Sequence, residues 1–358
     1  WSSDVCSSDL IKGGRVDYGV AHSQKYGHAR YGEKYPGVFP EWGTPVEHSG
    51  QIHSVHLIGH SMGGQTVRLL TELLAYGDPN EIRTAENEPV AAYSESAGQA
   101  SASRGSVSEL FAGGHRWVRS ITTIATPHDG TTLTQRFANV GIMEKVFAGL
   151  VAHSSLQKED PLIQLHLQHW SVRKKTHETF EQFLLRVIRN DLWQETEDFS
   201  YFDLSPAGAK KLNMRTSTHQ GVYYFSWATS RTVPDGDAGH HVPMRGMSLL
   251  LHPTARYMGS LEDLPEGIDG APELWWENDG MVNTCSMDGP SLGRPAPILR
   301  YEKPTPGVWN FRGTLKPLDH LQVSLVLPIS GDAPPGYDSL AEFYEQWCRF
   351  LTNLPEVE

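Results

Sequence analysis

A serine flanked by glycines carries the clearest chemical signal in the chain. Residues 59–64 read Gly-His-Ser-Met-Gly-Gly and fit the G-x-S-x-G pattern of a nucleophile elbow. An apolar run typical of a buried strand, 54–59, precedes the serine, and residues 62–76 follow it with helical spacing of apolar residues. In that setting the turn presents the hydroxyl of Ser61, and the backbone N–H of Met62 points at a developing oxyanion. The pattern predicts nucleophilic catalysis by Ser61; outside that setting the glycines would be ordinary turn residues.

A nucleophilic serine needs a base, and the base needs an acid that orients it. In hydrolases built around this elbow the chain order is serine, acid, histidine. Asp279 lies in a glycine-bearing turn at 277–283, and His320 lies in a loop near the C-terminus. We expect these two residues to complete a triad with Ser61. The chain has 17 histidines, so other side chains stay open as acid or base. These alternatives are Asp319 as the acid, and His60, His128, His240 or His241 as the base.

The elements around these residues alternate between strand and helix patterns. Strand-like runs lie at 54–59, 118–125 and 223–228, with weaker ones at 298–301 and 307–310. Helical patterns lie at 62–76, 137–151, 178–191 and 338–354. This order predicts an α/β-hydrolase fold, with a mainly parallel sheet between helices and a helical cap inserted at about 134–200. Two further segments are expected to be irregular: 12–50, a loop with short helical pieces, and 88–107, a flexible insert.

Composition narrows the class of protein. With 358 residues, 39% of them hydrophobic, the chain can build one large core or a core and a cap. A net charge of −12 argues against nucleic acid as the partner and gives no attraction to anionic membranes. We find no apolar run long enough for a transmembrane helix. Three cysteines form neither a disulfide framework nor a cysteine metal site.

The first ten residues differ in character from the rest. They repeat Ser-Ser-Asp, and the repeat fits neither a strand nor an amphipathic helix. Such a stretch resembles a translated adapter, so we expect residues 1–10 to be non-native and residues 11–358 to form the hydrolase domain.

Longer patterns surround the candidate triad in six segments. They are 16–22, 59–66, 122–132, 201–209, 277–283 and 318–321. Together these segments are similar to the bacterial family I.5, or staphylococcal-type, lipases, and the resemblance extends from about residue 11 to residue 354. It implies a secreted triacylglycerol lipase that acts on lipid or ester at a lipid–water interface. It also implies a helical lid and a structural zinc ion, and it assigns the triad to Ser61, Asp279 and His320.

The chain departs from this family at its start. The N-terminal region of the family, with its first strand and a His-Gly-Phe loop, has no counterpart here. That loop supplies the second oxyanion N–H, and removing one such donor costs about 3–4 kcal/mol of transition-state stabilisation. We therefore expect the first strand to be missing and the oxyanion hole to be incomplete.

Two implied metal sites differ in how well the chain preserves them. By resemblance, zinc ligands fall on His22, His28 and Asp198, while the fourth position is Ser2, with Asp4 nearby. The zinc site is thus expected to be incomplete. At two positions where the family holds calcium with acids, this chain has Gln322 and Leu327. Since Ca²⁺ prefers carboxylate oxygens, we expect no calcium.

Three functions remain in competition at this point. The first is a lipase or esterase that acts through an acyl-enzyme on Ser61. The second is a catalytically incompetent truncated homologue or binding module, and the third is a metal-dependent hydrolase that uses the zinc ligands. The apolar residues of 134–160 have helical spacing and fit either a core-facing helix or a lid over Ser61.

Overall fold

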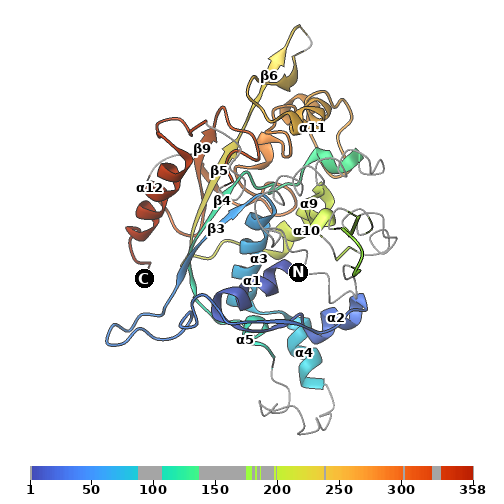
Figure 1. The fold of residues 1–358 in the computed structure, drawn as a ribbon. Coiled ribbons are helices and arrows are strands. Elements are labelled where there is room, and N and C mark those ends of the chain that lie inside the picture. Colours follow the sequence, from blue (N-terminus) through green and yellow to red (C-terminus); the bar gives the residue numbers. More distant parts are fainter. Residues whose placement is uncertain are drawn as a thin grey trace. The chain divides into compact units, whose positions relative to one another are not determined.

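The computed structural model describes most of the chain (Figure 1). The chain divides into two compact units. The described residues are 2–87, 107–136, 175–179, 182–183, 186, 197–198, 200–237, 239–300, 303–324 and 332–357. Unit 1 comprises residues 1–55, 68–118 and 166–173. Unit 2 comprises residues 56–67, 119–165 and 174–358 and contains the candidate triad.

The main sheet has five strands. In spatial order they are β3 (Val55–His60), β4 (Val118–Ile124), β5 (Tyr223–Thr229), β9 (Trp309–Leu315) and β8 (Ile298–Arg300). The pairs β4–β5, β5–β9 and β8–β9 are parallel. Strands β4 and β5 are buried along most of their length, as expected for central strands of a parallel sheet. The sheet confirms the predicted α/β architecture, although β9 begins two residues later than the predicted strand and runs further.

Helix α12 (Leu340–Thr352) packs against this sheet, as Figure 1 shows beside β5 and β9. Ser339 caps its N-terminus by accepting a hydrogen bond from the amide of Glu342 at 3.1 Å. The indole of Trp347 lies against Phe225 and donates to Thr122 Oγ1 in β4 at 3.0 Å. The predicted closing helix is thereby confirmed, and it fixes one face of the sheet.

Unit 2 contains several further elements. Helix α10 (Pro206–Arg215) follows α9 (Ser200–Leu204), and an antiparallel hairpin joins β6 (Thr232–Asp235) to β7 (His240–Pro243). Helix α11 (His252–Met258) follows the hairpin. In the described part of the chain, the short turns of 3-10 helix are η1 (Thr132–Arg136), η3 (Leu249–Leu251), η4 (Pro272–Trp275) and η5 (Thr284–Ser286).

Unit 1 contains structure where the sequence predicted a loop. Strands β1 (Gly14–Asp17) and β2 (Tyr31–Tyr35) form an antiparallel pair around α2 (Val20–Tyr26). The prediction for 12–50 was wrong about these strands because each is too short to show a clear alternation of apolar and polar residues. Helix α3 (Met62–Tyr76) appears as predicted, and its second part belongs to unit 1 with α4 (Pro79–Asn87) and α5 (Glu109–Ala112).

The first residues of the chain are helical. Helix α1 spans Ser2–Lys12, although the Ser-Ser-Asp repeat offers no amphipathic face, and Lys12 forms an ion pair with Glu109. That residues 1–10 are non-native stays a prediction.

Two predicted segments lie largely outside the described residues. These are the insert, of which only residue 107 is described, and the cap at about 134–200 with its lid at 134–160. The cap and lid therefore stay predictions. Among the described helices, we find none whose length and apolar character would let it cross a membrane.

Candidate active site

Ser61 occupies a strained turn between β3 and α3. Its φ is 56°, in the left-handed region that residues other than glycine rarely adopt. The backbone amide of Ser61 donates to Ile124 O in the neighbouring strand at 2.9 Å, and its carbonyl accepts from Gly64 N at 3.0 Å. These two bonds hold the turn in place, in the strand–turn–helix order that the sequence predicts.

The three glycines of the motif are crowded to different degrees. A Cβ at Gly59 would lie 2.4 Å from Gly63 O, so strand and helix do approach closely there. A Cβ at Gly64 would lie 2.0 Å from Thr126 Oγ1, whereas one at Gly63 would have no neighbour within 4 Å. The crowded position after the serine is therefore Gly64, not the Gly63 that the motif marks.

The structure brings the three predicted catalytic side chains together in unit 2. Ser61 Oγ lies 2.8 Å from His320 Nε2, and His320 Nδ1 lies 2.8 Å from Asp279 Oδ2. When Nδ1–H donates to the carboxylate, Nε2 is left to accept the proton of the serine hydroxyl. Asp279 is fully buried and His320 is 4% exposed, so solvent competes little for these bonds.

The surroundings of Asp279 keep its carboxylate ionised. Oδ1 accepts from the backbone amides of Met281 and Val282 at 3.0 and 2.8 Å, and Oδ2 accepts from Thr229 Oγ1 at 2.6 Å. Burial acts to raise the pKa of Asp279, but the imidazole of His320 and these hydrogen bonds outweigh it and hold the pKa below its ordinary value. Sequence reasoning missed Thr229, a polar residue at the carboxyl end of a central strand, where sites of parallel sheets gather.

Asp319, the alternative acid, accepts hydrogen bonds from backbone amides. Its Oδ2 accepts from Ser248 N at 2.7 Å, and its Oδ1 accepts from the amides of Leu321 and Gln322 at 3.0 and 3.1 Å. Burial raises the pKa of Asp319, and the charge of Asp279 adds to the rise. The carboxylate thus shapes the backbone turn that carries His320.

His60, one of the alternative bases, supports His320 instead of competing with it. Its Nε2 lies 3.0 Å from His320 O, and the two rings are 4.7 Å apart between centroids. Burial and the charge on His320 lower the pKa of His60 to about 3, so the ring is neutral and Nε2–H donates to the carbonyl. Sequence reasoning did not find this contact, which joins residues 260 positions apart.

The other alternative histidines contact residues away from the serine. His128 is fully buried and its Nε2 lies 2.9 Å from Thr123 Oγ1. The ring of His240 packs edge-on against Trp276 at 4.6 Å, and His241 Nδ1 lies 3.2 Å from a threonine hydroxyl.

Met62 has the position that an oxyanion donor needs. It is the first residue of α3, so its N–H is among the four amides that have no acceptor inside the helix. The positive end of the helix dipole lies at the same point, which favours a negative oxygen beside Ser61.

Two of the predicted zinc ligands lie close together in unit 1. His22 is buried in α2, and His28 follows Gly27, which ends the helix with a φ of 71°. Their ring centroids are 5.1 Å apart. His28 Nδ1 lies 2.9 Å from Ala29 O, and donation to that carbonyl leaves Nε2 with the lone pair that a metal requires. The pair converges because helix α2 ends at Tyr26, between the two histidines.

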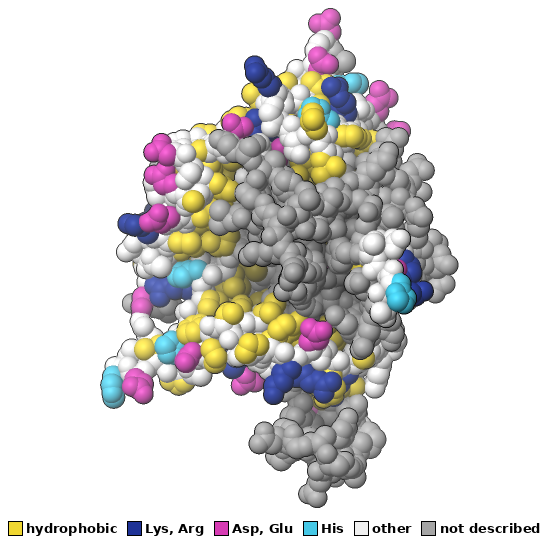
Figure 2. Space-filling view, viewed as in Figure 1, with side chains coloured by type: hydrophobic (Ala, Val, Ile, Leu, Met, Phe, Trp, Pro, Cys, Tyr) yellow, Lys and Arg dark blue, Asp and Glu magenta, His cyan; other side chains and the backbone are white. Residues whose placement is uncertain are grey.

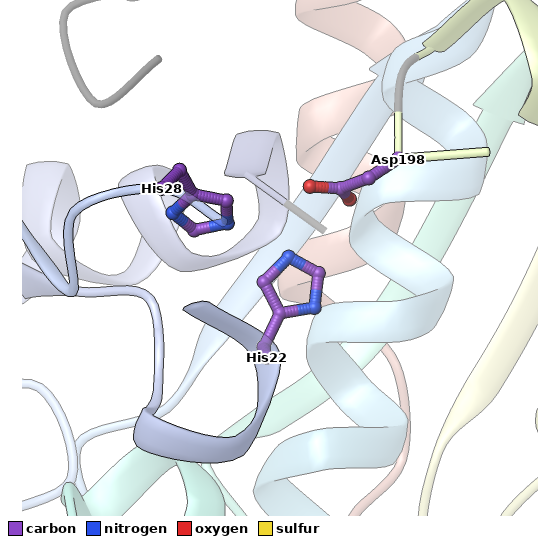
Figure 3. Close-up of side chains that lie close together, drawn as sticks. All are labelled: His22, His28 and Asp198. Carbon is purple, nitrogen blue, oxygen red and sulfur yellow. The ribbon is translucent and has the colours of Figure 1, made fainter. Parts of the chain in front are cut away.

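Ionic contacts shape the backbone around this pair. Glu81 accepts from the amides of Ala21 and His22 at 3.0 and 2.7 Å, which anchors the start of α2. Arg30 forms a two-pronged ion pair with Asp17 at 2.8 and 2.9 Å. Figure 3 labels the two histidines and Asp198, the third predicted ligand, which belongs to unit 2. Two nitrogens and a carboxylate form a donor set that suits zinc.

The residues at the implied calcium position do not fit that ion. Gln322 Oε1 accepts from Arg231 Nη1 at 2.6 Å, so a guanidinium already binds the oxygen that a calcium ion would take. A divalent cation there would meet a positive charge and a neutral amide. Leu327, the other position, lies outside the described residues.

Comparisons with known proteins identify the family of the chain. A family model described as "Lipase-like, C-terminal domain" matches residues 5–354. The chain belongs to this family. Curated relatives of this lipase-like domain include a lipase of Staphylococcus hyicus, 35% identical over 352 residues, which are 97% of this chain and 48% of the relative. A lipase of Staphylococcus epidermidis is 34% identical over 349 residues, 97% of this chain and 45% of the relative. The chain thus spans about half the length of these curated relatives, and the staphylococcal resemblance is confirmed.

Three solved structures share the fold of this chain. EstA from Clostridium botulinum matches with a TM-score of 0.80 and 32% identity, covering 100% of this chain and 76% of that one. Lipase 1 from Pelosinus fermentans matches with a TM-score of 0.80 and 33% identity, covering 99% and 86%. The Staphylococcus hyicus lipase matches with a TM-score of 0.70 and 32% identity, covering 97% and 80%.

Proposed function

We propose that this lipase-like domain is a carboxylic ester hydrolase, and that its substrate is a triacylglycerol or related lipid ester. The observation that carries the proposal is the hydrogen-bonded chain from Ser61 through His320 to Asp279. The names of the relatives, which include several lipases, support lipid ester as the substrate class.

The chemistry follows from the direction of these hydrogen bonds. Ser61 Oγ attacks the ester carbonyl carbon while His320 Nε2 takes its proton, and the charge forming on the carbonyl oxygen is stabilised by Met62 N–H. The ionised Asp279 stabilises the protonated imidazole. His320 then returns the proton to the leaving alcohol, which leaves an acyl group on Ser61. Water, deprotonated by His320, hydrolyses that ester in the second half of the reaction.

The surface is consistent with a substrate held by apolar contact. On the face drawn in Figure 2, acidic side chains are spread over the described part of the surface, with Lys and Arg side chains between them. A net charge of −12 gives no pull towards anionic lipid, so the proposal relies on apolar contact at the lipid–water interface. By family resemblance we also propose that the protein is secreted.

We further propose a structural role for zinc, held by His22, His28 and Asp198. Bound zinc would supply a cross-link between distant parts of the chain. The reaction derived above needs no proton or electron from that position.

Turnover of a p-nitrophenyl ester separates the three candidate functions. The proposed serine hydrolase keeps its activity after treatment with a chelator and loses it in Ser61→Ala. Loss on chelation, with Ser61→Ala still active, would favour a metal-dependent hydrolase. Wild-type protein without turnover on any p-nitrophenyl ester would favour the incompetent homologue or binding module.

A further inference from the structure

A buried arginine links the two loops that carry the acid and the base of the triad. Arg231 lies two residues beyond Thr229 and is 4% exposed. Its backbone amide donates to Asn278 O at 3.1 Å, next to Asp279. Its Nη1 donates to Pro317 O at 2.8 Å and to Gln322 Oε1 at 2.6 Å, on the two sides of His320 in the sequence.

The two terminal nitrogens of the guanidinium have further oxygen partners. Nη2 donates to Arg245 O at 3.1 Å, and Nη1 forms an ion pair with Asp332 Oδ2 at 2.6 Å. A Cβ at Gly246, where φ is 88°, would lie 2.0 Å from Nη2, so the missing side chain provides the room. Two carbonyls, an amide and a carboxylate are the kind of oxygen set that a hard divalent cation binds.

Gln322 connects the guanidinium of Arg231 directly to the turn that carries His320. The side-chain Oε1 of Gln322 also accepts a hydrogen bond from Asp319 N at 2.9 Å, and the backbone amide of Gln322 donates to the Asp319 carboxylate. A guanidinium stays charged at every pH at which proteins fold, and its fork of donors is rigid. It can therefore fix this turn permanently, without a ligand that dissociates.

We propose that Arg231 is a positioning residue for the triad, an internal cation that holds the His320 loop against the Asp279 loop in place of calcium. The proposal rests on the ester hydrolysis proposed above. It has two consequences: the rate depends on the guanidinium, and calcium does not alter the rate.

The test compares Arg231→Gln, Arg231→Lys and a matched control, Arg349→Gln, whose arginine lies exposed on α12 with an i,i+4 partner. Turnover of p-nitrophenyl butyrate is measured at constant zinc, in calcium-free buffer and then with millimolar CaCl2. We expect kcat of Arg231→Gln to fall by about 10- to 100-fold with KM little changed, as for a misplaced catalytic group. Arg231→Lys, which keeps the charge but loses the fork, should recover part of kcat. CaCl2 should change none of these rates, and the control should match wild type.

Several results would overturn the proposal. They are an Arg231→Gln enzyme with wild-type kcat, a loss confined to KM, or a wild-type rate that rises with CaCl2. If Arg231→Gln does not fold, two measurements still test the proposal. They are the kcat of Arg231→Lys, expected between those of an inactive enzyme and wild type, and the wild-type rate with CaCl2, expected to be unchanged. Wild-type protein that hydrolyses no ester refutes the proposed function, whereas active wild type with an unaffected Arg231→Gln refutes only the role of Arg231.

Discussion

Two adjacent glycines in the nucleophile elbow should respond in opposite ways to the same substitution. In Gly64→Ala, the new methyl would lie 2.0 Å from Thr126 Oγ1 and 2.6 Å from Thr126 Cγ2. Thr126 is fully buried and follows Ala125, whose φ is 52°, so this segment has little freedom to move away. In Gly63→Ala, the methyl would have no neighbour within 4 Å, and the residue lies in the first turn of α3.

The magnitudes follow from these distances. A contact of 2.0 Å requires a shift of more than 1 Å to become an ordinary contact, and such overpacking costs about 1–3 kcal/mol of folding free energy. Replacing an uncrowded helical glycine by alanine gains about 0.5–1 kcal/mol, because the unfolded chain loses freedom. Because both glycines lie in α3, this gain applies to both variants, and their free energies of unfolding should differ by the overpacking cost alone, about 1–3 kcal/mol.

Urea denaturation of both variants and of wild type measures this difference. Thr126→Ala, which removes the two nearest atoms, provides the double-mutant cycle: combined with Gly64→Ala it should restore part of the lost stability, and combined with Gly63→Ala it should be additive. Equal effects of the two glycine substitutions, or an additive cycle at Gly64, would refute the packing described for the elbow.

Other predictions concern the groups around the triad, the metal and the lid. His60 has a pKa of about 3 in the fold and 6.5 when free, so the free energy of unfolding should fall as the pH drops below 6.5, by at most about 2 kcal/mol at pH 5. Urea midpoints at pH 7 and pH 5 should show this loss in wild type. The same loss in His60→Gln would contradict the assignment of the effect to His60. Thr229→Val should raise the pKa of Asp279 and lower kcat/KM by about 10-fold, through loss of a hydrogen bond to a charge worth about 1.5–3 kcal/mol; an unchanged pH–rate profile would count against it. Elemental analysis should find zinc in purified wild type and less in His22→Ala, and equal zinc contents would dismiss the site. If residues 134–160 form a lid, the rate of hydrolysis should rise sharply above the solubility limit of the ester. A smooth saturation curve of rate against ester concentration would instead favour a core-facing helix.

Local patterns were enough to predict the centre of the site. The apolar run of β3, the glycine turn and the helical spacing of α3 are contiguous, so they identify Ser61 without knowledge of the rest of the fold. Asp279 and His320 needed the chain order of the triad and the family resemblance, because 17 histidines give a single one little weight. The structure brings all three together.

The groups that support the triad could not be read from local patterns. Arg231 and Gln322 meet across 91 positions, and His60 meets His320 across 260, so neither contact leaves a periodic signal. The motif contains Gly63 and Gly64 side by side, and only the position of Thr126 shows which one is crowded.

The most direct test of the account is to identify the nucleophile. Wild-type protein and Ser61→Ala are treated with a fluorophosphonate ester, digested, and analysed by peptide mass spectrometry alongside p-nitrophenyl ester turnover. If Ser61 is the nucleophile, we expect one adduct per chain, on Ser61, and a loss of kcat of roughly 10⁴-fold or more in Ser61→Ala. An adduct on another residue of the wild type, or a Ser61→Ala enzyme with the wild-type rate, would contradict this role for Ser61.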